Sequence, residues 1–328
     1  MKAKNSEKLV LTIAPVLHAL EENDATKLIE AFLTAHDVSE SSRQSYRKRL
    51  RQFFCWCTQN SIKMPTRETI VAYKRSLRER KFAPTSEGAY LVAVRVFFAW
   101  AAEQELHADV AANIKGPKRV RGFKRDPLTI NQVHELLGSI DQSTLKGMRD
   151  FALINLMVRT GPRTIEISRA CVDNISQQSG EVVLWLRGKG RDSADEFVVL
   201  TDSSLRPIMK YLAARGRPKP SEPLFGSTSD GNKHQRMSTR AIRRIVKQRL
   251  RGISLDSPRL SAHSMRHTAI TMSLLAGVSV QEAQALARHS SIDTTMIYAH
   301  NLERAAGIPE KAIDSFLATT EKGQRTTL

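Results

Sequence analysis

A short basic segment without apolar periodicity divides the sequence into two parts. Residues 115–127, KGPKRVRGFKRDP, contain six basic residues, two glycines and two prolines. Glycine and proline interrupt helices and strands, so this composition is typical of an interdomain linker. A chain of 328 residues is also long enough for two domains of about 150 residues each. We therefore predict an N-terminal extension (1–19), a first domain (20–114), a linker (115–126), a second domain (127–317) and a flexible tail (318–328).

The first domain is predicted to contain four helices. Apolar residues recur at helical spacing on one face of the segment 41–58, at Tyr46, Leu50, Phe53, Phe54 and Cys57. The pattern predicts three further helices over about 24–36, 66–80 and 84–104. Bundles of this kind bury their apolar faces against one another.

The second domain mixes helices with one β-hairpin. Two β-prone runs, Val182–Leu186 and Glu196–Leu200, flank a polar, glycine-containing stretch, which favours a hairpin. Helices are predicted over about 130–140, 145–159, 203–214, 238–250, 264–276, 279–287 and 291–298. The predicted fold class is therefore mainly α, with an N-terminal four-helix domain and a mixed α/β domain that carries a small antiparallel sheet.

The charge of the chain points to a polyanionic partner. The sequence holds 51 Lys and Arg against 33 Asp and Glu, a formal net charge of +18 that both halves of the chain share. Such a charge on a folded chain favours nucleic acid, although it does not separate DNA from RNA or a binding protein from an enzyme. No run approaches the about 18 apolar residues of a membrane span. Three cysteines cannot make a disulfide framework, which fits the cytoplasm.

Basic residues concentrate in two places that we predict to contact phosphates. The segment 41–81 is strongly basic, and no acidic residue lies between Ser41 and Arg67. A solvated helix face normally interleaves both signs, so this imbalance favours a binding surface over the simpler alternative of a solvated face. The candidate DNA-binding residues of the predicted helix and of the linker are Arg43, Arg47, Lys48, Arg51, Lys118, Arg119, Arg121 and Lys124.

Four local patterns in the second half could carry chemistry. They are Thr160–Glu166 (TGPRTIE), Gly188–Arg191 (GKGR), His263–His267 (HSMRH), and His289 followed nine residues later by Tyr298. Arginine forks bind phosphate oxygens, and His263 lies on the same helix face as Arg266. Taken singly, each pattern is also compatible with an ordinary cap, turn or core residue. The pair His263 and His267 lacks a nearby third ligand, so we predict no metal site.

In this order the four patterns resemble the tyrosine recombinase (phage integrase) family, which includes two-domain Xer-like and Cre-like types. The resemblance covers essentially the whole chain. Two positions depart from the usual family pattern: Pro162 stands where leucine is common, and Arg288 stands where glycine commonly precedes the histidine. Neither departure removes a functional group. Arg288 could add a phosphate contact or alter the local turn, and the sequence leaves both open.

The resemblance implies roles for individual residues. Tyr298 is the expected nucleophile, Arg163 and Arg266 clamp the phosphate, and Lys189 protonates the leaving oxygen. His263 accepts or shares a proton, and His289 hydrogen-bonds the phosphate. Glu166 and His267 are expected to support these groups. The covalent ester conserves the energy of the broken bond, so no cofactor or metal is expected.

The resemblance also implies how the protein works as a whole. The expected activity is site-specific strand exchange through a 3′-phosphotyrosyl intermediate, by a homotetramer on double-stranded DNA with inverted-repeat sites. The first domain is then a core-binding, SAM-like domain. Residues 308–317 are a candidate segment for docking on a neighbouring subunit. Two alternatives stay open: a type IB topoisomerase, and a non-catalytic DNA-binding protein on the same scaffold. The biological role could be integration, resolution or excision.

Overall fold

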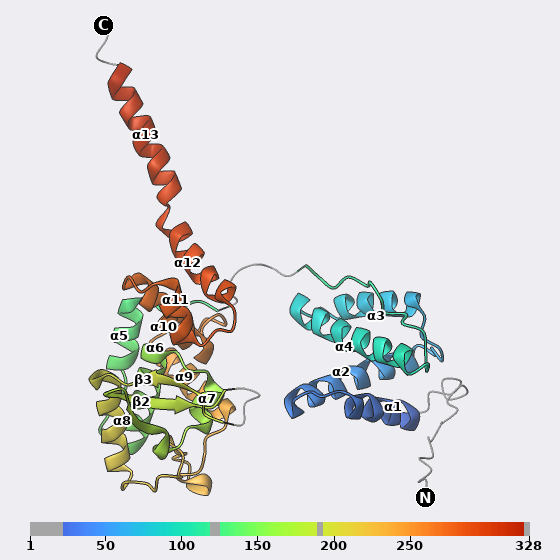
Figure 1. Ribbon diagram of the computed structural model, residues 1–328, viewed down its shortest axis with the longest axis horizontal. Coiled ribbons are helices and arrows are strands. Elements are labelled where there is room, and N and C mark those ends of the chain that lie inside the picture. The colour runs from blue at the N-terminus through green and yellow to red at the C-terminus, as the bar shows by residue number, and fades with distance from the viewer. Residues whose placement is uncertain (1–21, 119–124, 189–192, 325–328) are drawn as a thin grey trace, which may run out of the picture. The chain divides into compact units, whose positions relative to one another are not determined.

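The computed structural model describes residues 22–118, 125–188 and 193–324. The chain divides into two compact units, one ending at Arg121 and the other beginning at Gly122 (Figure 1). This division falls within the predicted linker 115–126. The predicted extension 1–19 and half of the linker, residues 119–124, lie outside the described residues. No helix in the described part of the chain is long and apolar enough to cross a membrane.

The first unit contains four helices around an aromatic core. These are α1 (Glu22–Ala35), α2 (Glu40–Gln59), α3 (Arg67–Glu79) and α4 (Pro84–Glu103). Ser39 caps α2, Thr66 forms a capping box on α3, and a proline opens α4, so local sequence sets each start. Phe32, Phe53 and Phe98 are almost fully buried in the core that the four helices share. The four predicted helices are thus confirmed within one or two residues at each end.

The second unit is built around the buried helix α6 (Leu145–Thr160), which packs against its neighbours α5, α8 and α10. Every residue of α6 from Ala152 to Val158 is buried. The other helices are α5 (Ile130–Gly138), α7 (Thr164–Arg169), α8 (Asp202–Ala214), α9 (Thr239–Gly252), α10 (Ala262–Leu275), α11 (Val280–Ala287), α12 (Ile292–Ala306) and α13 (Ile308–Gln324).

A three-stranded antiparallel sheet completes the second unit. Its strands are β1 (Ile175–Gln178), β2 (Glu181–Leu186) and β3 (Glu196–Val199), in the order β1-β2-β3. Leu184 pairs with Ile175 on one side and with Val198 on the other. The predicted hairpin is therefore present, and the predicted class, mainly helical with a small antiparallel sheet, is confirmed. The strand β1 was not predicted.

Two C-terminal helices extend further than the sequence pattern predicted. Helix α12 continues to Ala306 instead of ending near Tyr298, and α13 continues to Gln324. The structure thus places helix over the first seven residues of the predicted tail 318–328. Gly307, in a left-handed conformation with φ of 60°, separates the two helices.

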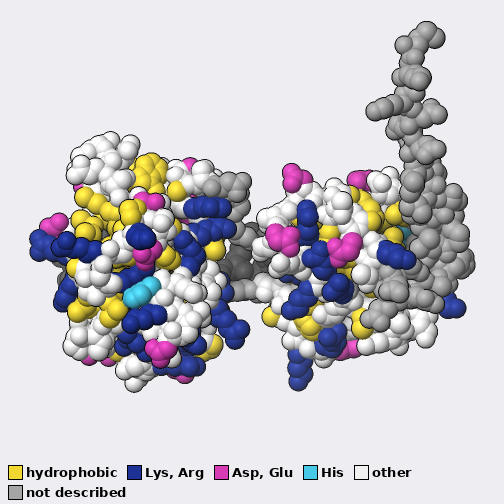
Figure 2. All heavy atoms as spheres, turned by 90° about the horizontal axis from the view of Figure 1, so that it is seen from below, with side chains coloured by type: hydrophobic (Ala, Val, Ile, Leu, Met, Phe, Trp, Pro, Cys, Tyr) yellow, Lys and Arg dark blue, Asp and Glu magenta, His cyan; other side chains and the backbone are white. Residues whose placement is uncertain are grey.

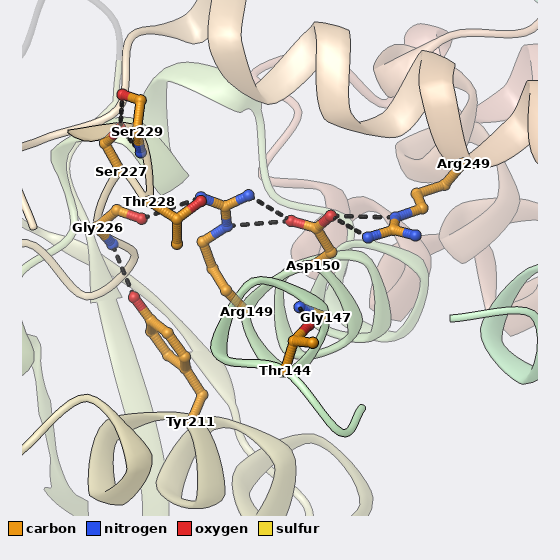
Figure 3. A network of polar contacts seen from close by, with 10 residues as sticks. All are labelled: Thr144, Gly147, Arg149, Asp150, Tyr211, Gly226, Ser227, Thr228, Ser229 and Arg249. Carbon is orange, nitrogen blue, oxygen red and sulfur yellow. Dashed lines mark hydrogen bonds and ion pairs between the residues drawn. The ribbon is translucent and has the colours of Figure 1, made fainter. Parts of the chain in front are cut away.

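A buried ionic network links α6 to α9 (Figure 3). Asp150 accepts hydrogen bonds from Arg149 through one carboxylate oxygen and from Arg249 through the other, with shortest distances of 2.7 and 2.6 Å. Arg149 also donates to Thr228 Oγ1 at 2.9 Å, which ties the segment before α9 to the start of α6. The side chains of Arg149 and Asp150 are only 4% and 3% exposed. This network contributes to the rigidity of the second unit.

Candidate active site

The turn between α6 and α7 places the first arginine of the site. Gly161 ends α6 with φ of 61°, and a Cβ at this position would lie 3.2 Å from the Cβ of Ala269. Glycine is therefore favoured both by its conformation and by the close approach of α10. Arg163 follows as the N-cap of α7 (Thr164–Arg169).

Glu166 holds Arg163 in a fixed orientation. Its carboxylate is fully buried and accepts two hydrogen bonds of 2.7 Å from Arg163, one from the backbone N–H and one from Nη1. Burial alone would raise the pKa of Glu166, but the charge of Arg288 and the bonds from Arg163 hold it below its usual range. Glu166 is therefore ionised at neutral pH, and its predicted supporting role fits this geometry.

Arg266 is the second arginine and comes from α10. Its side chain donates to Gly161 O at 2.7 Å and to Ala287 O, so two backbone carbonyls fix its plane. Burial and the nearby charge of Arg163 lower the pKa of Arg266 to about 10. It remains protonated at neutral pH and can supply positive charge to a phosphate.

Two histidines of α10 lie in contact with each other. The ring centroids of His263 and His267 are 4.6 Å apart in an edge-to-face arrangement. His263 is exposed, whereas His267 is buried and tilts against the ring of Tyr298 at 5.2 Å. Burial and the charge of His263 lower the pKa of His267 to about 4. The pKa of His263 is also lowered, by partial desolvation and then by Arg266. Both rings are therefore neutral at pH 7.

Tyr298 is held in an apolar environment on α12. It is 4% exposed and packs with Ile270 and Ala287. Burial raises the pKa of Tyr298 to about 12, although the charge of Arg266 acts in the opposite direction. A phenol in this position is protonated at neutral pH, so a proton acceptor or strong positive charge is needed before it can attack.

His289 also lies beside Tyr298. The two ring centroids are 6.2 Å apart, and burial lowers the pKa of His289 to about 4. His289 Nδ1 and Thr295 Oγ1 share a hydrogen bond of 2.9 Å, which orients the imidazole. Thr295 is fully buried and was not selected from the sequence. The sequence did contain one indication of its role, because Thr295 lies three residues before Tyr298 and therefore on the same helix face.

The base of the hairpin borders the same site. Arg169 donates to Gly188 O at 2.6 Å and so anchors the strand end that leads to the hairpin tip. Lys189 itself lies outside the described residues. An open cleft of about 790 Å³ is lined by residues of four local segments, among them Arg163, Gly188, Glu196, Arg288 and His289. The cleft joins the hairpin base to the arginine and histidine groups of the site.

The predicted DNA-binding residues differ in their exposure to solvent. Lys48, Arg51 and Lys118 are exposed, and Arg43 is half-buried. Arg47 instead forms a two-pronged ion pair with Glu30, at 2.6 and 2.7 Å. Arg119, Arg121 and Lys124 lie outside the described residues. Lys and Arg side chains are spread over the visible surface of both units (Figure 2).

The second unit thus brings together most of the side chains that the sequence patterns singled out. Two arginines, three neutral imidazoles and a buried phenol converge from α7, α10, α12 and the segment between α11 and α12. Among the described residues there is no cluster of three or more His, Cys, Asp or Glu side chains that could hold a metal ion. The positive charge near a bound phosphate would come from arginine.

Comparison with known proteins identifies the family. A model described as the phage integrase family matches residues 127–304, and a model of the phage integrase N-terminal SAM-like domain matches residues 27–105. The chain belongs to the phage integrase family, and it is a tyrosine-type site-specific DNA recombinase of the Xer-like two-domain kind.

Individual relatives agree with this assignment. The chain is 28% identical to the tyrosine recombinase XerD of Vibrio cholerae, over 83% of this chain and 91% of that protein. It is also 28% identical to XerD of Bifidobacterium longum, over 90% of this chain and 98% of that protein.

Solved structures share the fold. The XerH recombinase in a post-cleavage complex with its palindromic difH substrate covers 91% of this chain and 95% of its own, with a TM-score of 0.67 and 19% identity. A lambda integrase dimer bound to a core site covers 87% of this chain and 78% of its own, with a TM-score of 0.66 and 14% identity.

Proposed function

We propose that this chain cuts and rejoins double-stranded DNA at inverted-repeat sites through a covalent bond to Tyr298. The observation that carries the proposal is the convergence of Arg163, Arg266, His289 and Tyr298 within one unit, with His263 and His267 beside them. This convergence brings residues of three of the four sequence patterns together, and it supports the proposal together with the matching family model.

The cleavage step balances without a cofactor. The oxygen of Tyr298 attacks the scissile phosphorus, forms a 3′-phosphotyrosyl bond and breaks the bond to the 5′ oxygen. Arg163 and Arg266 stabilise the charge on the non-bridging oxygens, and His289 donates a hydrogen bond to one of them. Lys189 gives a proton to the leaving 5′ oxygen, and His263 accepts the proton of the phenol. The 5′ hydroxyl of the partner strand then reverses these steps.

Strand exchange requires several copies of the chain on two sites. We assign this assembly to a homotetramer, in which α13 docks on a neighbouring subunit. Ile313, Phe316 and Leu317 on α13 are 58%, 73% and 56% exposed, which is unusually high for apolar side chains on a 17-residue helix. Docking would remove this apolar area from water. The reaction takes place where DNA is accessible, and we place it in the cytoplasm.

The DNA-binding surface is expected to involve both units. The exposed residues Lys48 and Arg51 of α2 would contact phosphates, and the basic linker with Lys118, Arg119, Arg121 and Lys124 would follow the DNA backbone. The formal charge of +18 predicts that binding weakens steeply as salt is added.

A nicked DNA substrate tests the proposal directly. A nick next to the cleavage position releases a short strand, so the covalent adduct accumulates and migrates as a protein–DNA band on a denaturing gel. The site would first be selected from a random DNA pool, where an inverted repeat with a short central spacer is expected. Wild-type protein should form the adduct and Tyr298→Phe should not.

Tyr211→Phe is the matched control. Tyr211 is the other tyrosine of the second unit; it is buried, and its hydroxyl accepts a hydrogen bond from Gly226 N at 3.1 Å. This variant removes a buried hydroxyl away from the site and should keep forming adduct. Absence of an adduct with every selected DNA would favour a non-catalytic binding protein. Relaxation of supercoiled DNA without exchange between two sites would favour a topoisomerase.

A further inference from the structure

Arg288 occupies a backbone conformation that arginine disfavours. It ends α11 with φ of 52° and ψ of 49°, in the left-handed region. A side chain with a Cβ is strained there, whereas the glycine that is common at this position in the family adopts this conformation freely. Such strain persists where the surrounding structure compensates for it. The contacts of the Arg288 side chain are therefore expected to compensate for the backbone strain.

The side chain of Arg288 points into the protein and not toward bulk solvent. It is 4% exposed. Nη2 donates to Glu166 Oε2 at 2.9 Å, and Nη1 donates to Leu286 O at 2.8 Å. The remaining nitrogen, Nε, makes no hydrogen bond with any described residue and lies 3.8 Å from Glu196 Oε2. This orientation answers the question left open by the sequence, because the guanidinium is committed to internal partners.

These contacts connect the two arginines of the clamp. The Glu166 carboxylate accepts hydrogen bonds from both Arg163 and Arg288. The Gly161 carbonyl oxygen accepts hydrogen bonds from Arg266 at 2.7 Å and from Arg288 Nη2 at 3.4 Å. In addition, Arg163 Nη2 donates to the backbone O of Arg288 at 3.1 Å. Through its side chain and its carbonyl, Arg288 closes a hydrogen-bonded ring with Glu166 and Arg163. It also shares the carbonyl of Gly161 with Arg266.

Arg288 also changes the charge balance of this ring. Glu166 is a fully buried carboxylate, and an unshared ion pair with Arg163 would neutralise the charge that Arg163 offers to a phosphate. With Arg288 as a second cation on Glu166, the trio of Arg163, Glu166 and Arg288 keeps a net positive charge. Glu196 offsets this charge only in part, because it lies 3.8 Å from Arg288 and is 24% exposed. Arg163 is thus held by Glu166 without losing its electrostatic effect on the transition state.

We propose that Arg288 is a positioning residue for strand cleavage, which orients Arg163 and Arg266 through Glu166 and the carbonyl of Gly161. It acts through these groups and does not itself touch the DNA. The proposal rests on the proposed function, because it concerns the step in which Tyr298 attacks the phosphate.

The test compares single-turnover cleavage of the nicked substrate by several full-length variants. Arg288→Gly removes the guanidinium and suits the left-handed backbone, so the fold is preserved. We expect the cleavage rate constant to fall about 10- to 100-fold, with the Kd for DNA changed less than about threefold. Arg288→Lys keeps the charge and should recover part of the rate. If Arg288→Gly does not fold, the comparison of Arg288→Lys with wild type carries the test.

A double variant identifies the route of the effect. If Arg288 acts mainly through Glu166, then Glu166→Gln combined with Arg288→Gly should be about as slow as Glu166→Gln alone. The pH profile gives a second readout. Without Arg288 the pKa of Glu166 rises, so Glu166 becomes protonated and releases Arg163 at a higher pH. The acid limb of the cleavage rate should therefore move to higher pH in Arg288→Gly.

Arg149→Lys is the control for a general loss of stability. It changes another buried arginine that binds a buried carboxylate, about 16 Å along α6 from its C-terminal end (Figure 3). Its rate per folded molecule should equal that of wild type. Four results would each overturn the positioning role and leave the proposed function intact. They are a wild-type rate in Arg288→Gly, rate losses that multiply in the double variant, an acid limb that does not move, and an equal loss of rate in Arg149→Lys. Failure of wild type to form an adduct would overturn both.

Discussion

Replacing Asp150 by alanine should destabilise the second unit strongly. The carboxylate is 3% exposed and is shared by Arg149 and Arg249. Arg149 is itself 4% exposed, so the substitution leaves a buried guanidinium without its anionic partner, whereas Arg249 at 28% exposure can reach water. Breaking a buried pair in this way costs about 3–5 kcal/mol. For a unit of this size, each kcal/mol lowers Tm by about 2–4 °C, which predicts a fall of about 6–20 °C.

Asp256→Ala is a matched comparison for this prediction. Asp256 is also shared by two cations, Arg251 at 2.9 Å and Lys247 at 3.0 Å, but its side chain is 57% exposed. An exposed pair of this kind is screened by water and contributes little to stability. Calorimetry of the full chain resolves the transition of each unit. Equal shifts of Tm in the two variants would refute the reasoning, because burial is the main difference between the two carboxylates.

Four further predictions follow from the site and the surface. Lys189→Ala should slow cleavage by about 10²- to 10⁴-fold, and a substrate with sulfur in place of the 5′ bridging oxygen should restore the rate, because a thiolate leaves without a proton; no rescue would exclude Lys189 as the acid. Lowering the pH from 7 to 5 should reduce the free energy of unfolding, measured in urea, by about 2 kcal/mol for each of His267 and His289. The pKa of each is about 4 in the folded state, below the unfolded value, so stability is lost as pH falls below about 6.5. The variant His267→Asn should lessen this pH dependence. Lys48→Ala should lower the salt dependence of DNA binding by about one unit of slope, and Arg47→Ala should change it less because Arg47 is paired with Glu30. Cleavage should proceed unchanged in EDTA, and its loss on chelation would contradict the metal-free reaction.

The sequence was sufficient for the elements with strong local signals. Helices such as α2 and α3 combine an apolar stripe with a capping serine or threonine, and both features depend only on neighbouring residues. The strand β1 was missed because its sequence ISQQ has one apolar residue and its three other side chains are exposed. Its conformation comes from pairing with β2, which a local pattern does not contain.

The residues of the site also differ in how far local sequence predicts them. Arg163, Arg266 and Tyr298 were found because each lies in a recognisable run of neighbours. The role of Arg288 depends on Glu166, a partner 122 residues earlier, and on a left-handed turn that the sequence would assign to glycine. Thr295 was missed since its bond to His289 becomes visible only when the turn after α11 brings the two together. Long-range contacts of this kind require the folded structure.

The environment of Tyr298 restricts where its proton can go. The two imidazoles nearest its ring, His267 and His289, have pKa values of about 4, so burial makes both of them poor bases at neutral pH. His263 touches His267 but is exposed, so a positive charge on it remains partly solvated. We infer that the proton leaves toward His263 and that His267 serves to pack Tyr298 without becoming charged. This division explains why two adjacent histidines on one helix face, four residues apart, can have different functions.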